Sequence, residues 1–147
     1  SINATNGYNI IINSLSTSYG SLFLPHFVHN IQNNNANGKP LIYLKNIRNG
    51  VLDYSGQPVG SLIIVNTSNL TFVNAQLTDD GVQMYSSNGT SINNFTINIS
   101  KLGVTGLILN GGNKNSILSN LISTAQSGGI LASLSSNLSI DSNNVTA

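Results

Sequence analysis

The stretch LIIVNTSNLTFVNAQLTDDG, residues 62–81, holds two short apolar segments that an asparagine-containing turn separates and an acidic turn closes. Similar units follow it: VQMYSSNGTSINNFTINISKLG from residue 82, LILNGGNKNSILSNLISTAQSGG from residue 107 and ILASLSSNLSIDSNNV from residue 130. The spacing of about 20–25 residues falls in the range that is typical of stacked repeat architectures. Each unit is therefore interpreted as one coil of a solenoid.

Each unit contains short segments in which apolar and polar residues alternate, and β-branched residues are frequent in them. This pattern is typical of strands and not of helices. We expect the first strands of the coils at 21–24, 41–44, 62–65, 82–85, 107–110 and 130–133. Second strands are expected at 9–13, 51–54, 70–73, 91–93, 116–119 and 138–141, and third strands at 75–77, 95–97 and 121–123.

Asparagine and glycine recur between these strands, and both residues accept the left-handed backbone of tight bends. Bends repeated in register would stack asparagine amides into hydrogen-bonded ladders. The expected ladder residues are Asn74, Asn94, Asn120 and Asn143. Glycine is expected to end each unit at Gly20, Gly60, Gly81, Gly103 and Gly129.

These patterns predict an all-β fold, a right-handed parallel β-helix of about five to six coils that forms one domain over residues 1–147. Single coils cannot bury their apolar face, but stacked coils can. A leucine-rich repeat has a similar period, but its L-x-x-L-x-L-x-x-N frame is absent. An immunoglobulin-like sandwich is the other alternative, and the in-register asparagine and glycine argue against it.

The segment TSNLTFVNAQLTDDGVQMYSSNGTSINNFTI, residues 67–97, resembles the right-handed β-helix repeats of the pectin-lyase-like superfamily. Within that superfamily it is most similar to the asparagine-rich carbohydrate-binding and sugar-hydrolase repeat of archaeal surface proteins. The resemblance extends from about residue 9 to residue 145. It implies the fold much more strongly than a function, because this superfamily hosts many activities and binding roles.

The composition excludes several classes of function. Only 6% of residues are charged, glutamate is absent, and the net charge is +1, so no basic face for nucleic acid is expected. Without cysteine there is neither a disulfide framework nor a thiolate metal site. No apolar segment is long enough to span a membrane, and no cofactor is expected.

Sequons favour an extracellular or cell-surface location, because asparagine in this motif accepts glycans in secreted proteins. The candidate glycosylation sites are Asn3, Asn66, Asn69, Asn88, Asn94, Asn98, Asn137 and Asn144. A chain so rich in asparagine, serine and threonine also forms such motifs by chance. The scarcity of carboxylates predicts tolerance of acid, because acid denaturation mainly protonates carboxylates that the native state uses.

The closest pair of carboxylates is Asp79–Asp80, which resembles the paired aspartates of polygalacturonases. The Asn-Thr-Asp, Gly-His-Gly and Arg-Ile-Lys motifs of that family are missing, so no catalytic residues are assigned and no enzyme is predicted. Tyr54 and Tyr85, together with Asp79 and Asp80, are candidate carbohydrate contacts, since tyrosine rings can stack on sugars. Packing in the solenoid explains these tyrosines equally well.

The sequence therefore favours a structural or adhesive surface module that self-associates through its ends into a filament or lattice and carries glycans. A carbohydrate-binding or polysaccharide-degrading β-helix is the alternative function. A viral spike or fibre segment is a further alternative, because such fibres use the same fold.

Overall fold

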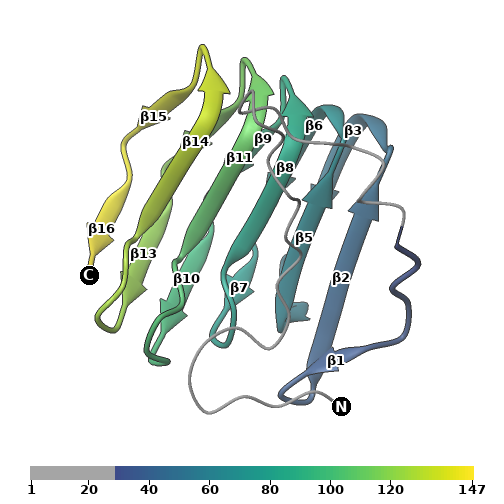
Figure 1. The fold of residues 1–147 in the computed structure, drawn as a ribbon. Coiled ribbons are helices and arrows are strands. Elements are labelled where there is room, and N and C mark those ends of the chain that lie inside the picture. The colour runs from purple at the N-terminus through teal and green to yellow at the C-terminus, as the bar shows by residue number, and fades with distance from the viewer. Residues whose placement is uncertain (1–28) are drawn as a thin grey trace, which may run out of the picture.

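Three short strands per coil, joined by tight corners, wind the chain into a solenoid in the computed structural model, which describes residues 29–147 (Figure 1). The first strands of the coils are β2 (Lys39–Lys45), β5 (Ser61–Val65), β8 (Val82–Asn88), β11 (Leu107–Asn113) and β14 (Ile130–Ser136). The second strands are β3 (Arg48–Asp53), β6 (Ser68–Val73), β9 (Ser91–Asn93), β12 (Ser116–Leu118) and β15 (Ser139–Asp141). The third strands are β4 (Pro58–Val59), β7 (Gln76–Leu77), β10 (Thr96–Ile99), β13 (Leu121–Thr124) and β16 (Asn144–Thr146).

Equivalent strands of successive coils pair in parallel, so the described residues form five stacked coils with three faces. A short additional strand, β1 (Asn35–Ala36), pairs antiparallel with β2 at the outer edge of the first coil. The predicted β-solenoid and its predicted strand positions within 41–141 are confirmed. The strands expected at 9–13 and 21–24, and Gly20, lie outside the described residues.

The coils differ in length, and the third coil is the longest. Contacts between the second and third coils join residues 20 apart, as between Asn74 and Asn94. Contacts between the third and fourth coils join residues 25 apart, and those between the fourth and fifth join residues 23 apart. The extra residues of the third coil lie between β10 and β11, where they form a loop that contains Lys101.

The core fills the inside of the coils with one apolar side chain above another. On the first face, Leu62 pairs with Val82 and Val82 pairs with Leu107, and all three side chains are completely buried. Burial of such a side chain contributes about 1.5–3 kcal/mol. Further inward residues are Ile64, Met84, Leu109, Phe72, Ile92, Ile117, Leu77, Ile97 and Ile122.

The corners between strands carry columns of residues with positive φ. In one column these residues are Asn49, Asn69, Gly89, Lys114 and Asn137, each at the same point of its coil. A second column contains Asn46, Asn66, Ser86, Gly111 and Leu134, and a third contains Asn74, Asn94, Ser119 and Ser142. Asparagine tolerates this conformation better than other non-glycine residues, which explains why it was such a strong signal in the sequence.

Glycine occupies one column for a steric reason. A Cβ atom at Gly81 would lie 2.0 Å from the carbonyl oxygen of Gly106, and a Cβ atom at Gly106 would lie 2.8 Å from the carbonyl oxygen of Gly129. Gly106, and not Gly103, therefore stands in register with Gly81 and Gly129. Gly103 lies in the loop between β10 and β11, where a Cβ atom would meet nothing within 4 Å.

Candidate functional site

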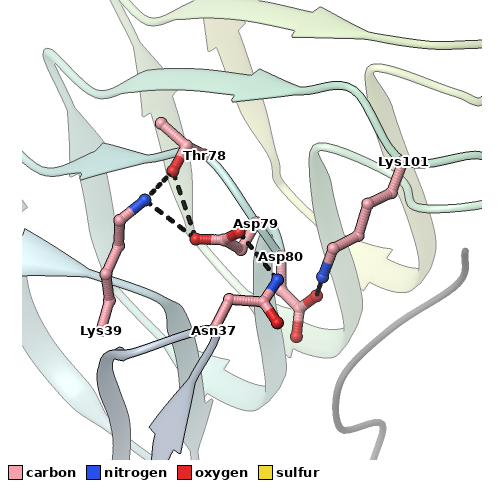
Figure 2. A network of polar contacts seen from close by, with 6 residues as sticks. All are labelled: Asn37, Lys39, Thr78, Asp79, Asp80 and Lys101. Atoms are coloured by element: carbon pink, nitrogen blue, oxygen red, sulfur yellow. Dashed lines mark hydrogen bonds and ion pairs between the residues drawn. The ribbon is translucent and has the colours of Figure 1, made fainter. Parts of the chain in front are cut away.

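Asp79 and Asp80 lie at the corner between β7 and β8, where the chain passes from the second coil to the third. Figure 2 shows that the corner brings together side chains from the β1–β2 hairpin and from the loop after β10. The two carboxylates bond to different partners from these two elements. The corner therefore joins segments from three successive coils.

Asp79 faces the β1–β2 hairpin. It accepts a hydrogen bond from Asn37 Nδ2 at 2.9 Å and forms an ion pair with Lys39 Nζ at 3.0 Å. Thr78 Oγ1 donates to the same carboxylate at 3.2 Å and also contacts Lys39 Nζ. Burial alone would raise the pKa of Asp79, but the hydrogen bonds from Asn37, Lys39 and Thr78 and the charge of Lys39 hold it below its usual value.

Asp80 faces the opposite neighbour. Its side chain is fully buried and lies 3.3 Å from Nζ of Lys101, whose side chain is only 9% exposed. Lys101 belongs to the longer loop between β10 and β11, so the ion pair fixes this loop against the preceding corner. Removal of one partner from such a buried pair typically costs about 3–5 kcal/mol.

The contacts of Asp79 and Asp80 at this corner hold neighbouring coils together. Glycoside hydrolysis normally requires one carboxyl group with a raised pKa to protonate the leaving oxygen. Asp79 has a lowered pKa, and Asp80 is paired with Lys101 inside the protein. This geometry suits the attachment of the first coil and of the loop near Lys101 to the rest of the solenoid.

Tyr54 and Tyr85, the other candidate carbohydrate contacts, lie largely inside the protein. Tyr54 is 8% exposed and packs with the core, and Tyr85 is 4% exposed and packs on the outward side of β8. Tyr85 also donates a hydrogen bond to Gln83 Oε1 at 3.0 Å. Burial raises the pKa of Tyr54. Little of either ring is available for stacking on a sugar in this arrangement.

Two adjoining hollows mark the outer surface near the third strands. One measures about 340 Å³ and is lined by Lys39, Gly56, Gln57, Pro58, Gln76 and Thr78. The other measures about 360 Å³ and is lined by Ser55, Gly56, Asn74, Ala75, Gln76, Asn94 and Thr96. The two hollows share Gly56 and Gln76, and amide and hydroxyl groups line much of the second one.

The expected ladder residues form two columns and not one. Asn94 Nδ2 donates to Asn74 Oδ1 at 2.8 Å, and Asn74 Nδ2 donates to Asp53 Oδ1 at 3.0 Å. Hydrogen bonds from Ser55 and from Asn74 lower the pKa of Asp53, which ends this exposed ladder. Asn120 stands in register with Phe95 and not with Asn94. Because the coils differ in length, the sequence alone does not decide whether Asn120 aligns with Asn94 or with Phe95.

Asn120 and Asn143 form the second column. At a buried corner, their side-chain amides bond to backbone groups. Asn120 Oδ1 accepts from the backbone N–H of Phe95 at 2.8 Å, and its Nδ2 donates to the carbonyl of Ile92 and to Asn143 Oδ1. Asn143 Nδ2 donates to the carbonyl of Ile117 at 2.8 Å. Asn115 makes the equivalent contacts with the backbone N–H of Thr90 and the carbonyl oxygen of Ser87 at another corner, and the sequence analysis did not single it out.

The sequon asparagines fall into two groups. Asn66, Asn69, Asn94 and Asn137 each donate from Nδ2, the atom that would carry a glycan, to the amide oxygen of another asparagine. Asn88, Asn98 and Asn144 are exposed and lie outside these ladder pairs. Asn3 lies outside the described residues. These three exposed positions are therefore the geometrically simplest acceptors.

Residues 29–147 contain no cluster of three or more histidine, cysteine, aspartate or glutamate side chains that could hold a metal ion. The same part of the chain contains no helix that is long and apolar enough to cross a membrane. The cationic partners of the two aspartates, Lys39 and Lys101, were not singled out from the sequence. Lys101 is one of only five basic residues, and its place in the longest unit was the available signal.

Searches of protein-family models, of curated proteins and of solved structures found no match to this chain.

Proposed function

We propose that this protein is a structural or adhesive module of a cell exterior, a solenoid rod that associates with further β-solenoid through its C-terminal coil. The observation that supports this proposal is the exposed inner side of that coil. Ile140 stands in register with Ile117, and Val145 with Ile122. Ile117 and Ile122 are completely buried, whereas Ile140 is 50% exposed and Val145 is 43% exposed.

The unpaired edges of β14, β15 and β16 strengthen this reading. Each of these strands pairs with one neighbour in the described chain and presents its other edge outward. Open strand edges beside apolar side chains favour the addition of another strand. A contact of this kind that does not close on itself propagates into a filament or lattice.

The test is the assembly state of the whole 147-residue chain, measured by light scattering on a size column and by negative-stain electron microscopy. We expect filaments or sheets for the wild type and their loss in Ile140→Asp and in Val145→Asp. Leu131→Asp is the control, because Leu131 is 52% exposed on the outward side of the same coil. A wild-type monomer would refute the proposal, and a closed trimer would favour a viral fibre segment.

The resemblance to asparagine-rich repeats of archaeal surface proteins supports the same location, as do the exposed sequons Asn88, Asn98 and Asn144. Glycopeptide mass spectrometry of protein from its native source tests this part of the proposal. Glycans are expected at these three positions and not at the ladder amides of Asn66, Asn69, Asn94 and Asn137.

A second candidate function is carbohydrate binding, which the two adjoining hollows favour. Ser55, Asn74, Gln76, Asn94 and Thr96 present neutral hydrogen-bonding groups there, and such groups can bind sugar hydroxyls without charge. Binding on a glycan array that Gln76→Ala abolishes would support this function. The absence of binding by the wild type would contradict this second candidate function.

A further inference from the structure

The first face of the solenoid has an apolar surface on its outward side. Side chains along a strand alternate between the inside and the outside of a coil. The outward positions of β2, β5 and β8 carry Leu41, Ile63, Val65 and Tyr85, which form a cluster separate from the core. Ile63 is completely buried, as is the inward Ile64 next to it.

This outward burial is confined to one part of the face. Ile63 is in register with Gln83, Gln83 with Ile108, and Ile108 with Leu131. Ile63 and Gln83 are completely buried, Ile108 is partly buried, and Leu131 is 52% exposed. The covered surface therefore spans β2, β5 and β8 and fades towards β14.

The described chain reaches this surface from its N-terminal side. Ile31 packs against the cluster of Leu41, Ile63, Val65 and Tyr85. Lys45 Nζ donates a hydrogen bond to the carbonyl oxygen of His29 at 2.7 Å. Lys45 pairs with Val65, so it too occupies an outward position. Residues 29–31 therefore lie at the border of the covered surface.

We propose that the N-terminal segment, residues 9–28, docks on this outward apolar face as a cover supplied by the same chain. The segment joins the described chain at residue 29, which lies at the border of the face. Its sequence includes Ile10-Ile11-Ile12, Leu22-Phe23-Leu24 and Phe27-Val28, and residues 1–38 contain no lysine, arginine, aspartate or glutamate. A segment with several apolar runs and no lysine, arginine, aspartate or glutamate matches a face whose buried residues are themselves mainly apolar.

Residues 9–28 are also long enough to cover this face. Three neighbouring strands at about 4.8 Å spacing present a face about 10–15 Å wide. Twenty extended residues reach about 66 Å, several times that width. The segment is thus long enough to cross the face more than once.

Limited chymotrypsin digestion of the whole chain tests the proposal, because the segment contains Tyr19, Phe23 and Phe27 as cleavage sites. Cleavage of a docked segment follows the population of its open form. We expect Ile63→Asn to speed cleavage within residues 9–28 by tenfold or more, since it replaces a buried apolar side chain of the face. Leu131→Asn, the matched outward substitution in the same column, should leave the rate unchanged.

Hydrogen exchange of the β11–β13 amides shows whether Ile63→Asn keeps the solenoid folded. If Ile63→Asn unfolds the solenoid, Val65→Ala is used in its place. We expect this variant to be cleaved within the segment about threefold to tenfold faster than the wild type. Equal cleavage rates in the wild type and in the folded variant would overturn the proposal. Protection that disappears on dilution would also overturn it, because the face would then bind a second copy and not the segment of its own chain.

Discussion

The first and last of the five described coils differ in how the edge of the sheet is protected. At the first coil, β1 pairs with the outer edge of β2, and Pro40 removes one backbone donor there. This coil also carries Lys39, Lys45, Arg48 and Asp53. In contrast, residues 130–147 contain Asp141 as their single charged residue. The inward side chains of the last coil have no described coil above them.

This difference indicates at which described coil a further strand can add to the sheet edge. Natural proteins protect sheet edges with short strands, prolines and charges. The first described coil has Pro40, Pro58 and several charged residues, whereas residues 130–147 contain no proline and one charged residue, so we expect association at the last described coil. The following predictions test the comparison between a coil with neighbours on both sides and the coil at the open end.

The largest difference is expected between Ile117→Ala and Ile140→Ala, which are in register in adjacent coils. Ile117 is completely buried, so its truncation leaves a cavity and should cost about 4 kcal/mol in the free energy of unfolding. Ile140 is half-exposed, and its truncation should cost about 1 kcal/mol. Urea unfolding in dilute solution measures both values. Equal losses would show that the last coil is covered in solution.

The next difference concerns glycine. In Gly81→Ala the new Cβ would meet the backbone oxygens of Gly106 and Thr105, which the following coils hold in place. We expect a cost of about 3 kcal/mol, in the upper range for overpacking. In Gly129→Ala the obstacle is the Val145 side chain, which belongs to the open last coil and can turn away, so about 1 kcal/mol is expected. Thermal unfolding compares the two variants, and a reversed order would contradict the described stacking.

A smaller difference is expected between Asn120→Ala and Asn143→Ala. Asn120 is 2% exposed, and its loss would leave Phe95 N–H and the Ile92 carbonyl without this partner in a buried place. Unfolding should become easier by about 2 kcal/mol. Asn143 is partly exposed, so water can replace its contacts and the cost should be about 1 kcal/mol. Asn120→Asp, measured at neutral pH, should cost more than Asn120→Ala if the buried amide donates as described.

The smallest effect concerns pH at the first coil. The pKa of Asp79 is lowered in the folded protein, so its ion pair stabilises the fold above the usual carboxyl pKa of about 3.9. That contribution is lost as the pH falls through the lower folded pKa. We expect a melting temperature that is constant from about pH 7 to pH 5 and falls by a few degrees below about pH 4. Asp79→Asn should reduce this fall, while a steep decrease already above pH 5 would contradict acid tolerance.

The strand positions could be predicted because each strand is short, alternates in polarity and is followed by asparagine or glycine. Gly103 was assigned wrongly to the glycine column of Gly81 and Gly129. The longer loop between β10 and β11 shifts the register by five residues. The periodicity of a single sequence could not show whether Gly103 or Gly106 continues that column. The same shift hid the fact that Asn120 follows Phe95 and not Asn94. Strands β1, β4 and β16 were missed, two of them because they contain only two residues.

The candidate site was less predictable than the fold. The sequence singled out Asp79 and Asp80 but not Lys39 and Lys101, because ion pairs between coils depend on the register of distant residues. The outward apolar face was visible in principle. Four consecutive apolar residues, Leu62 to Val65, indicate a strand that is buried on both sides, whereas alternation alone implies one buried side.

The direction of the hydrogen bonds between coils has a mechanical consequence. In parallel strands these bonds join one coil to the next, so they run along the long axis of the stack. Tension along that axis is shared by all the bonds between two neighbouring coils, and they must break together. A force that peels the last coil from its end would instead break them one after another. The rod is therefore expected to resist stretching and to yield to peeling, which is how a load-bearing fibre behaves when its ends are held by neighbours.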